Sequence, residues 1–403
     1  MCKKDQTIYL IGIGMGAQDS LTGEALRLLG DCGCVIGARR MTEALKGLEK
    51  PVFHAYMPDE IRGYIEAHRE YKKIAVALSG DPGFYSGAKK LEAELEGYEV
   101  IRVPGISSVV YLASRLHTSW EDAALVSAHG RIQNYIHAVA HNEKTFLLLG
   151  GETCGAALCE KLRYYGLEDV DCWIGRRLSY EDECIIHKKG SSLSPEDCSG
   201  LDVALILNAH PCRRTFCHVE DEEFIRGKVP MTKSEVRAVS MAKLQLHEDA
   251  VVYDIGAGTG SVAVEAAMQS GTIRVYAIEK NPEGALLIEE NKKKFRTDWV
   301  TVVEGTAPEA LLNLEAPTHV FIGGSSGNLK DILKTVKRKN PEVRIVLNAI
   351  SLETVKEAIE AVEEGILKEP EIVQIAASRS RKLGAYHMMT GLNPVYIITE
   401  GKA

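Results

Sequence analysis

The chain has 403 residues, of which 45% are hydrophobic and 26% are charged, and its formal net charge is −8 at neutral pH. Because single cores usually stop growing at roughly 250 to 300 residues, we expect two globular domains of similar size and no extensive disorder. The acidic balance argues against a nucleic-acid binder. The lack of a leader pattern or of about 18 consecutive apolar residues predicts a cytoplasmic protein without a membrane span.

The cysteines are distributed unevenly. All ten lie between Cys2 and Cys217, and they are scattered singly apart from Cys32 and Cys34. A chain of this length without secretory character is expected to keep them reduced. Their absence from the remaining residues indicates two modules with separate histories.

The first half alternates strand-like apolar runs with helical patterns. It opens with an apolar run over 7–16 that ends in glycines, followed by a helical pattern over 20–29. Further apolar runs of this kind lie at 74–78, 100–103, 145–149 and 203–207. This alternation predicts a layered α/β fold.

The pattern breaks between His210 and Val229, in a stretch rich in Cys, Arg and acidic residues. We therefore predict a first domain over 1–212, a linker over 213–228 and a second domain over 229–403. Strands are expected in the second domain at 250–255, 274–278, 300–303, 319–322, 344–347 and 395–398. Helical patterns between them predict a doubly wound α/β domain.

The strongest motif is Asp254-Ile-Gly-Ala-Gly-Thr-Gly260, which joins an apolar strand to a helical pattern. Glycines let the backbone turn sharply and approach a ligand, and the helix N-terminus presents free N–H groups. Glu279 ends the next expected strand, where a carboxylate can accept hydrogen bonds from ribose hydroxyls. Ser261 stands where dinucleotide-binding domains have a third glycine, so a different nucleotide-like cofactor is favoured.

This motif resembles motif I of the Rossmann-like methyltransferases that depend on S-adenosylmethionine (SAM). The resemblance implies that SAM is bound by Thr232, Gly256, Ala257, Gly258, Thr259, Gly260, Glu279, Thr306 and Ala307. It also implies that Gly323, Gly324 and Ser325 face the methyl acceptor, although an ordinary glycine turn would explain these three residues as well.

The first half carries three short segments, each directly after an expected strand: Gly12–Gly16, Ser79–Tyr85 and Val103–Ser108. Each alone is an everyday turn sequence, but their order and spacing resemble the tetrapyrrole methylase family, whose two α/β subdomains hold SAM between them. The resemblance implies cofactor contacts from Gly80, Asp81, Phe84, Ser107 and Ser108. Met15 replaces the proline usual in the first loop, so no contact is assigned to that loop.

In this order, the two halves resemble the fused, decarboxylating precorrin-6Y C5,15-methyltransferase family of cobalamin biosynthesis. The family implies methylation of C5 by the first domain, and of C15 with decarboxylation of the C12 acetate by the second. A tetrapyrrole with many carboxylates needs local cations, and the best cluster is Arg379, Arg381 and Lys382, which could equally form a solvated basic loop. His129 and His387 are candidate proton-transfer groups, with structural roles equally open.

Two other functions stay open at this point: an RNA methyltransferase with an accessory N-terminal domain, and a SAM-binding scaffold without catalysis. We expect one SAM per domain, no metal site, a small-molecule tetrapyrrole as partner, no nucleic-acid or membrane partner, and a homo-oligomer. Whether the substrate contains cobalt is not encoded in any pattern of the sequence.

Overall fold

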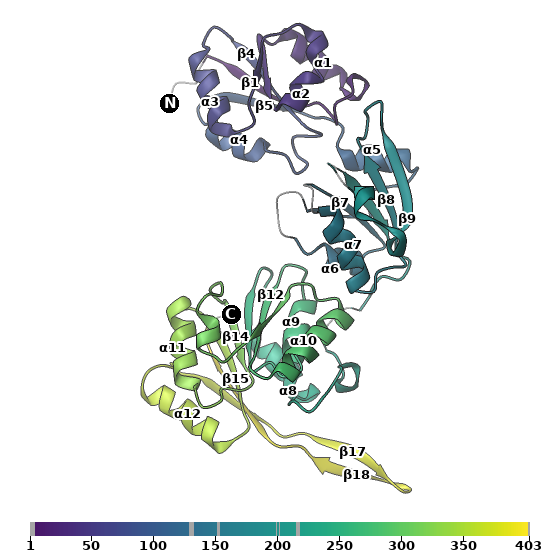
Figure 1. Cartoon of the computed structure of the whole chain (residues 1–403). Helices are drawn as coiled ribbons and strands as arrows, with labels where there is room; N and C mark the ends of the chain where they lie inside the picture. Colours follow the sequence, from purple (N-terminus) through teal and green to yellow (C-terminus); the bar gives the residue numbers. More distant parts are fainter. Residues whose placement is uncertain are drawn as a thin grey trace. The chain divides into compact units, whose positions relative to one another are not determined.

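The computed structural model describes residues 5–128, 133–150, 154–198, 200, 202–214 and 218–401. The chain divides into two compact units (Figure 1). The first consists of 1–132 and 142–211, and the second of 133–141 and 212–403. In the described part of the chain, no helix is both long enough and apolar enough to cross a bilayer.

The first unit begins with a parallel five-stranded sheet. Its strands, in spatial order, are β3 (Val52–His54), β2 (Cys34–Gly37), β4 (Lys73–Leu78), β1 (Thr7–Gly12) and β5 (Glu99–Val103). Helices cover both faces of this sheet: α1 (Gly23–Asp31) and α2 (Arg39–Glu43) pack on one face, and α3 (Pro58–Ala67) and α4 (Ala88–Glu94) on the other. Because β1 is buried on both faces, it is a continuous apolar run rather than an alternating one.

A second sheet of mixed direction completes this unit. Its strands, in spatial order, are β6 (Ala124–Ser127), β7 (Lys144–Leu148), β10 (Val203–Leu207), β8 (Asp171–Arg176) and β9 (Cys184–Lys189). The helices near it in the sequence are α5 (Ser108–Arg115), α6 (Tyr135–His141) and α7 (Cys154–Tyr164). Since β10 runs antiparallel to β7 and β8, it starts at the edge where those two strands end.

The second unit contains a seven-stranded sheet. Its strands, in spatial order, are β13 (Val300–Glu304), β12 (Arg274–Glu279), β11 (Val251–Ile255), β14 (His319–Ile322), β15 (Arg344–Ala349), β19 (Val395–Glu400) and β16 (Glu371–Ile375). One face is covered by α8 (Ser234–Leu244), α9 (Ser261–Met268) and α10 (Pro282–Phe295), the other by α11 (Leu329–Lys339) and α12 (Leu352–Glu363). The predicted doubly wound α/β arrangement is confirmed.

A two-stranded hairpin that the sequence does not predict extends from this sheet (Figure 1). It consists of β17 (Ser378–Leu383) and β18 (Tyr386–Gly391), inserted between β16 and β19. Since β16 and β15 both run antiparallel to β19, the hairpin starts at the edge where β15 ends.

Part of the segment expected to be a linker packs into the second unit. Val219 and Phe224 are buried with Val264 of α9 in a small apolar cluster. Asp221, in the short 3-10 helix η5 (Asp221–Glu223), is fully buried. Residues 218–224 therefore contribute to the core of the second unit.

Candidate functional site

Three loops meet at one edge of the first sheet, because the parallel neighbours β1, β4 and β5 all end there. Gly80 N–H donates to the Gly14 carbonyl at 2.6 Å, and Gly14 N–H donates back at 3.2 Å. A Cβ on Gly105 would lie 2.3 Å from the Gly80 carbonyl oxygen and 2.6 Å from that of Gly12. The three backbones therefore interlock too closely to admit a side chain at Gly105.

Asp81 ties two of these loops together. Its Oδ1 accepts the Gly83 N–H at 2.7 Å, and its Oδ2 accepts the Gly105 N–H at 3.1 Å. The geometry gives Asp81 a clear part in shaping the loops, and its contact with a cofactor stays a prediction.

A cavity of about 700 Å³ opens over the loops. Of the predicted cofactor residues, Gly80, Phe84 and Ser108 line it, while Ser107 is buried next to Ser108 at the start of α5. The volume lies within the range of about 300 to 1,000 Å³ that is usual for small-molecule sites. This cavity has room for a nucleotide-like cofactor, and its glycine-lined loops suit close backbone approach.

The cavity wall also contains side chains that sequence reasoning missed. Arg40 donates to the Met15 carbonyl at 3.2 Å, to the Tyr180 hydroxyl at 3.1 Å and to Ser79 Oγ at 3.2 Å. Arg177 and Asp202 line the same cavity. The Arg39-Arg40 pair is visible in the sequence, but nothing in its local pattern indicates that a loop 140 residues away lies beside it.

His129 lies outside the described residues. Cys154, another reactive residue type in this half, donates its Sγ–H to the Gly150 carbonyl at 2.6 Å, which agrees with a structural role.

The second unit has a smaller pocket of about 270 Å³ at the edge where β11, β12, β13 and β14 end. Predicted residues from four separate loops line it: Gly256, Gly258, Glu279, Thr306, Ala307, Gly323, Gly324 and Ser325. Ala257, Thr259 and Gly260 form the rest of the turn into α9, and none of these three is in the lining.

The glycine turn fits a closely bound ligand. Gly256 and Gly258 have φ values of +72° and +58°, in the left-handed region that favours glycine. A Cβ on Gly256 would lie 2.7 Å from the Gly324 carbonyl oxygen, and one on Gly258 would lie 2.3 Å from that of Pro230. The turn therefore packs closely against the backbone of Gly324 and Pro230, and Gly256 and Gly258 also line the pocket.

Glu279 lies at the tip of β12 and is only 8% exposed. Its Oε2 accepts the Gly258 N–H at 2.8 Å, and its Oε1 accepts the Asn281 N–H at 2.8 Å. Each carboxylate oxygen has a second lone pair, so ribose hydroxyls can still donate to it. With the apolar side chains of Ile278 and Ile332 in the same lining, the pocket suits an adenosyl group.

Asp254 supports the turn from below. Its Oδ2 accepts the Ala263 N–H near the N-terminus of α9 at 2.9 Å. Burial, against the opposing hydrogen bond from Ala263 and with a smaller contribution from the Glu279 carboxylate, raises the pKa of Asp254 to about 7. Asp254 does not line the pocket, so its effect on a bound cofactor is through the turn.

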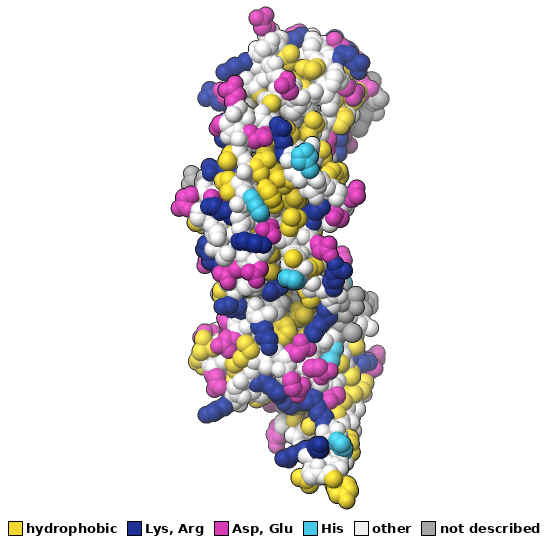
Figure 2. Space-filling model, turned by 90° about the vertical axis from the view of Figure 1, so that its right-hand side faces the viewer, with side chains coloured by type: hydrophobic (Ala, Val, Ile, Leu, Met, Phe, Trp, Pro, Cys, Tyr) yellow, Lys and Arg dark blue, Asp and Glu magenta, His cyan; other side chains and the backbone are white. Residues whose placement is uncertain are grey.

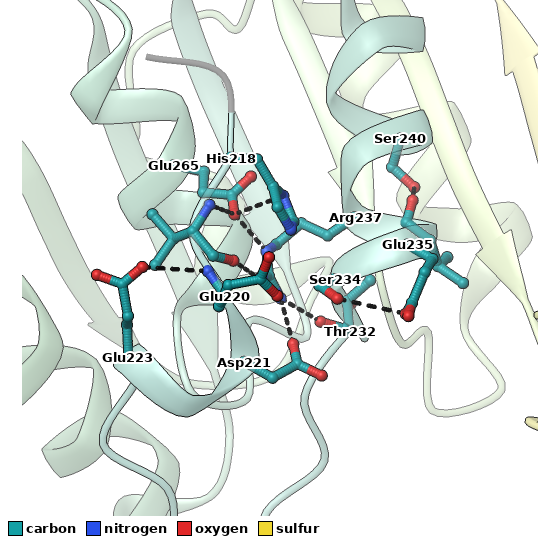
Figure 3. A network of polar contacts seen from close by, with 12 residues as sticks. His218, Glu220, Asp221, Glu223, Thr232, Ser234, Glu235, Arg237, Ser240 and Glu265 are labelled. Carbon is teal, nitrogen blue, oxygen red and sulfur yellow. Dashed lines mark hydrogen bonds and ion pairs between the residues drawn. The ribbon is translucent and has the colours of Figure 1, made fainter. Parts of the chain in front are cut away.

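A buried ion network fixes the segment that precedes α8 (Figure 3). Arg237 is fully buried and pairs with Asp221 at 3.2 Å and Glu265 at 2.6 Å. It also donates to the Thr232 carbonyl, which anchors this segment close to Val229 and Pro230 of the pocket lining. Thr232 itself is not in the lining, so its contact with SAM stays a prediction.

The predicted substrate cations lie on the hairpin and differ in their surroundings. Arg379, at its base, pairs with Asp221 at 3.0 Å and Glu235 at 2.7 Å, and Arg379 lowers the pKa of Glu235 to about 2. Arg381, Lys382 and His387 are exposed farther along. None of the four lines the 270 Å³ pocket. Arg379 is thus engaged within the protein, whereas the other three face solvent.

A lysine that the sequence analysis does not single out also lines this pocket. Lys280 follows Glu279, lines the pocket and donates to Ser326 Oγ at 2.9 Å. Its position directly after the end of an expected strand could have indicated that it lies at the pocket. Among the described residues, no group of three or more His, Cys, Asp and Glu side chains could hold a metal ion.

Comparison with known families gives one match for each half. Residues 7–194 match the tetrapyrrole (corrin/porphyrin) methylases, and residues 223–401 match the precorrin methyltransferase domain. The second match contains every residue that lines the smaller pocket. The first contains the lining of the larger cavity except Gly200, Asp202 and Val203.

Named relatives cover one half or both. A precorrin-6Y C(5,15)-methyltransferase [decarboxylating] from Sinorhizobium sp is 27% identical over 98% of this chain and 95% of the relative. A probable cobalt-precorrin-6B C(15)-methyltransferase (decarboxylating) from Pyrobaculum calidifontis is 43% identical over 45% of this chain and 94% of the relative. The crystal structure of a precorrin-6y C5,15-methyltransferase from Geobacter metallireducens is 43% identical, with a TM-score of 0.43, over 46% of this chain and 97% of that one.

Proposed function

The chain belongs to the tetrapyrrole methylases through its first half and to the precorrin methyltransferases through its second, and from this premise we propose that it methylates one corrin precursor twice. The proposed reactions are methylation of C5 in the first unit, and methylation of C15 with decarboxylation of the C12 acetate in the second. The substrate would be a precorrin-6-type ring, with or without cobalt, and the product a precorrin-8-type ring. The observation that carries the proposal is a separate pocket in each unit, built from loops at a sheet edge.

We propose that each pocket holds one SAM. In the first unit, Gly80, Phe84, Ser107 and Ser108 would border it, with Asp81 holding the loops in place. In the second, the turn over 256–260 would hold the donor, Glu279 would accept its ribose hydroxyls, and Thr232, Thr306 and Ala307 would border it. When bound, SAM supplies an already activated methyl group, so the chain's main contribution is orientation of the acceptor carbon.

The second reaction also requires control of charge. Decarboxylation sends the electrons of the breaking bond into the conjugated ring, and the protein can favour this step by orienting the acetate and excluding water. Gly323, Gly324 and Ser325 are placed to face the ring, and Lys280 is close enough to the pocket to attract a carboxylate. Arg381 and Lys382 would bind outer carboxylates and His387 would move a proton, if the hairpin folds over a bound ring. Arg379 would hold the base of that hairpin.

We also propose that the chain forms a homo-oligomer. An isolated two-stranded hairpin is marginally stable in water, and β18 exposes Tyr386, Met388 and Met389. Figure 2 shows apolar, basic and histidine side chains together at the lower end, where the hairpin lies. Location in the cytoplasm and the absence of a nucleic-acid partner stay predictions.

The function is tested by supplying the purified chain and SAM with cobalt-containing and cobalt-free precorrin-6-type rings. Mass spectrometry should show a gain of two methyl groups and a loss of carbon dioxide with one ring form. A gain of no methyl group with either ring, despite SAM binding, would favour a non-catalytic scaffold. Tight, salt-sensitive binding of tRNA would favour an RNA substrate.

A further inference from the structure

A buried carboxylate, Asp202, lines the cavity of the first unit. Asp202 immediately precedes β10, and β10 starts at the edge where β7 and β8 end, with Val203 level with Leu148 and Gly175. The Asp202 carbonyl accepts the Leu149 N–H at 2.9 Å, which fixes the backbone at this point. Asp202 therefore belongs to the second sheet, whereas Gly80 and Ser108 reach the same cavity from the first.

Asp202 is also chemically distinct from the other lining residues. Among the described residues that line the cavity, it is the only carboxylate. The ionisable side chains that share the wall are Arg40, Arg176, Arg177, Tyr56, Tyr85 and Tyr180. In the part of the chain that the structure describes, Asp202 forms no ion pair, although the charge of Arg176 acts on it.

The environment of Asp202 gives it the properties of a proton acceptor. The side chain is only 3% exposed, and burial raises its pKa above the ordinary 3.8. The Gly200 N–H, which donates to Oδ2 at 3.0 Å, and the charge of Arg176 act in the opposite direction. Such a carboxylate can be ionised at neutral pH and still be a stronger base than an exposed one.

Carbon methylation needs such an acceptor. The ring carbon gives an electron pair to the new carbon–carbon bond, and the methyl–sulfur bond breaks with its electrons left on sulfur. The positive charge of the donor has then moved to the ring. It is removed when the methylated carbon, or a conjugated N–H, releases a proton and the bonding electrons return to the ring.

We propose that Asp202 is the catalytic residue that accepts this proton in the first unit. The proposal rests on the proposed function, since it concerns the proton released by ring methylation. The proton bonds to a carboxylate oxygen, Asp202 becomes neutral, and solvent takes the proton after the product leaves. Arg177, which lines the same cavity and pairs with the exposed Asp182, adds positive charge that can attract the carboxylates of the ring.

The test uses the full chain with the substitution Asp202→Asn. Removal of a general base typically lowers a rate by about 10²- to 10⁴-fold, so single-turnover methylation by the first unit should fall by about 100-fold or more. Decarboxylation by the second unit, measured in the same tube, should be unchanged. Calorimetry should show S-adenosylhomocysteine bound to the first unit with unchanged affinity.

Two further readouts separate catalysis from structure. In the wild type, the methylation rate should rise with pH through a pKa above 3.8 and then level off, and the Asn variant should lose this dependence. In ¹³C NMR spectra of chains labelled at the aspartate carboxyls, the resonance absent from Asp202→Asn should titrate with the same raised pKa. Asp202→Glu, which keeps a carboxylate, should restore part of the rate even if the Asn variant folds poorly.

Asp171→Asn is the matched control, because Asp171 lies at the opposite end of β8 and pairs with Lys189 and His187. It should leave both reactions unchanged. A variant Asp202→Asn that keeps the wild-type methylation rate and pH profile would overturn the inference. If the wild type itself produces no methylated ring, the proposed function has failed instead.

Discussion

The two pockets are built in contrasting ways. In the first unit, three loops interlock at Gly12, Gly80 and Gly105, and a second sheet closes the cavity from the other side. In the second unit, the loops that follow the four neighbouring strands β11 to β14 of a single sheet line a smaller pocket. One methyl donor is proposed for both pockets, and the proposal therefore requires two different local motifs to bind the same ligand.

The contrast also extends to the carboxylates. Glu279 is bonded to backbone N–H groups of its own pocket loops and is suited to binding ribose. Asp202 lines its cavity next to β10 of the second sheet, and we propose that it acts on the acceptor ring. The larger cavity of about 700 Å³ has room for a second group beside a cofactor, whereas the pocket of about 270 Å³ has less.

The largest effect is expected from Gly105→Ala. The added Cβ would lie 2.3 Å from the Gly80 carbonyl oxygen, and this contact is with backbone, which cannot move aside cheaply. Overpacking typically costs about 1 to 3 kcal/mol, so we expect donor affinity in the first unit to fall by about 10- to 100-fold, and its methylation to need a correspondingly higher SAM concentration. Calorimetry with S-adenosylhomocysteine measures the affinity.

Gly63→Ala is the control, because Gly63 lies in α3 outside the cavity lining and an added Cβ there would meet no atom within 4 Å. It should leave donor affinity in the first unit unchanged. Loss of the second pocket's affinity in Gly105→Ala would contradict the separation of the two pockets.

A smaller effect, confined to the other pocket, is expected from Glu279→Ala. The substitution removes the proposed ribose acceptor and also frees the Gly258 N–H. Hydrogen bonds to charged groups contribute about 1.5 to 3 kcal/mol, so affinity for S-adenosylhomocysteine in the second unit should fall by about 10- to 100-fold without loss of the first site. Glu304→Ala is the matched control, because Glu304 is the register neighbour of Glu279 at the exposed tip of β13. If the two variants bind S-adenosylhomocysteine in the second unit with equal affinity, Glu279 does not bind the ribose.

The smallest effect is expected from Glu235→Gln at the base of the hairpin. Because Arg379 lowers the pKa of Glu235 from 4.5 to about 2, ionised Glu235 stabilises the fold above about pH 4.5, and this contribution is lost as the pH falls toward 2. The pair is partly exposed, so the loss of unfolding free energy at pH 6 should be about 0.5 to 1 kcal/mol. Urea titrations should show the variant less stable at pH 6 and equal to the wild type near pH 2. Glu248→Gln, at an exposed position, is the control. An equal loss of unfolding free energy in this variant would argue that the ion pair between Glu235 and Arg379 does not stabilise the fold.

The sequence predicted the second pocket better than the first, for a physical reason. Gly256, Gly258 and Glu279 lie within one β–α–β unit, so hydrophobic periodicity and a short spacing place them together. Arg40, Tyr180 and Asp202 come from distant segments, and only the packing of two sheets brings them to one cavity. The hairpin was missed because its strands are exposed on both faces and lack apolar alternation.

The central claim is that one chain contains two separate donor sites. Calorimetric titration of the full-length chain with S-adenosylhomocysteine tests it most directly. We predict two molecules bound per wild-type chain, with Gly105→Ala weakening one site and Glu279→Ala weakening the other. Binding of a single molecule per wild-type chain, or one substitution removing both sites, would contradict the account.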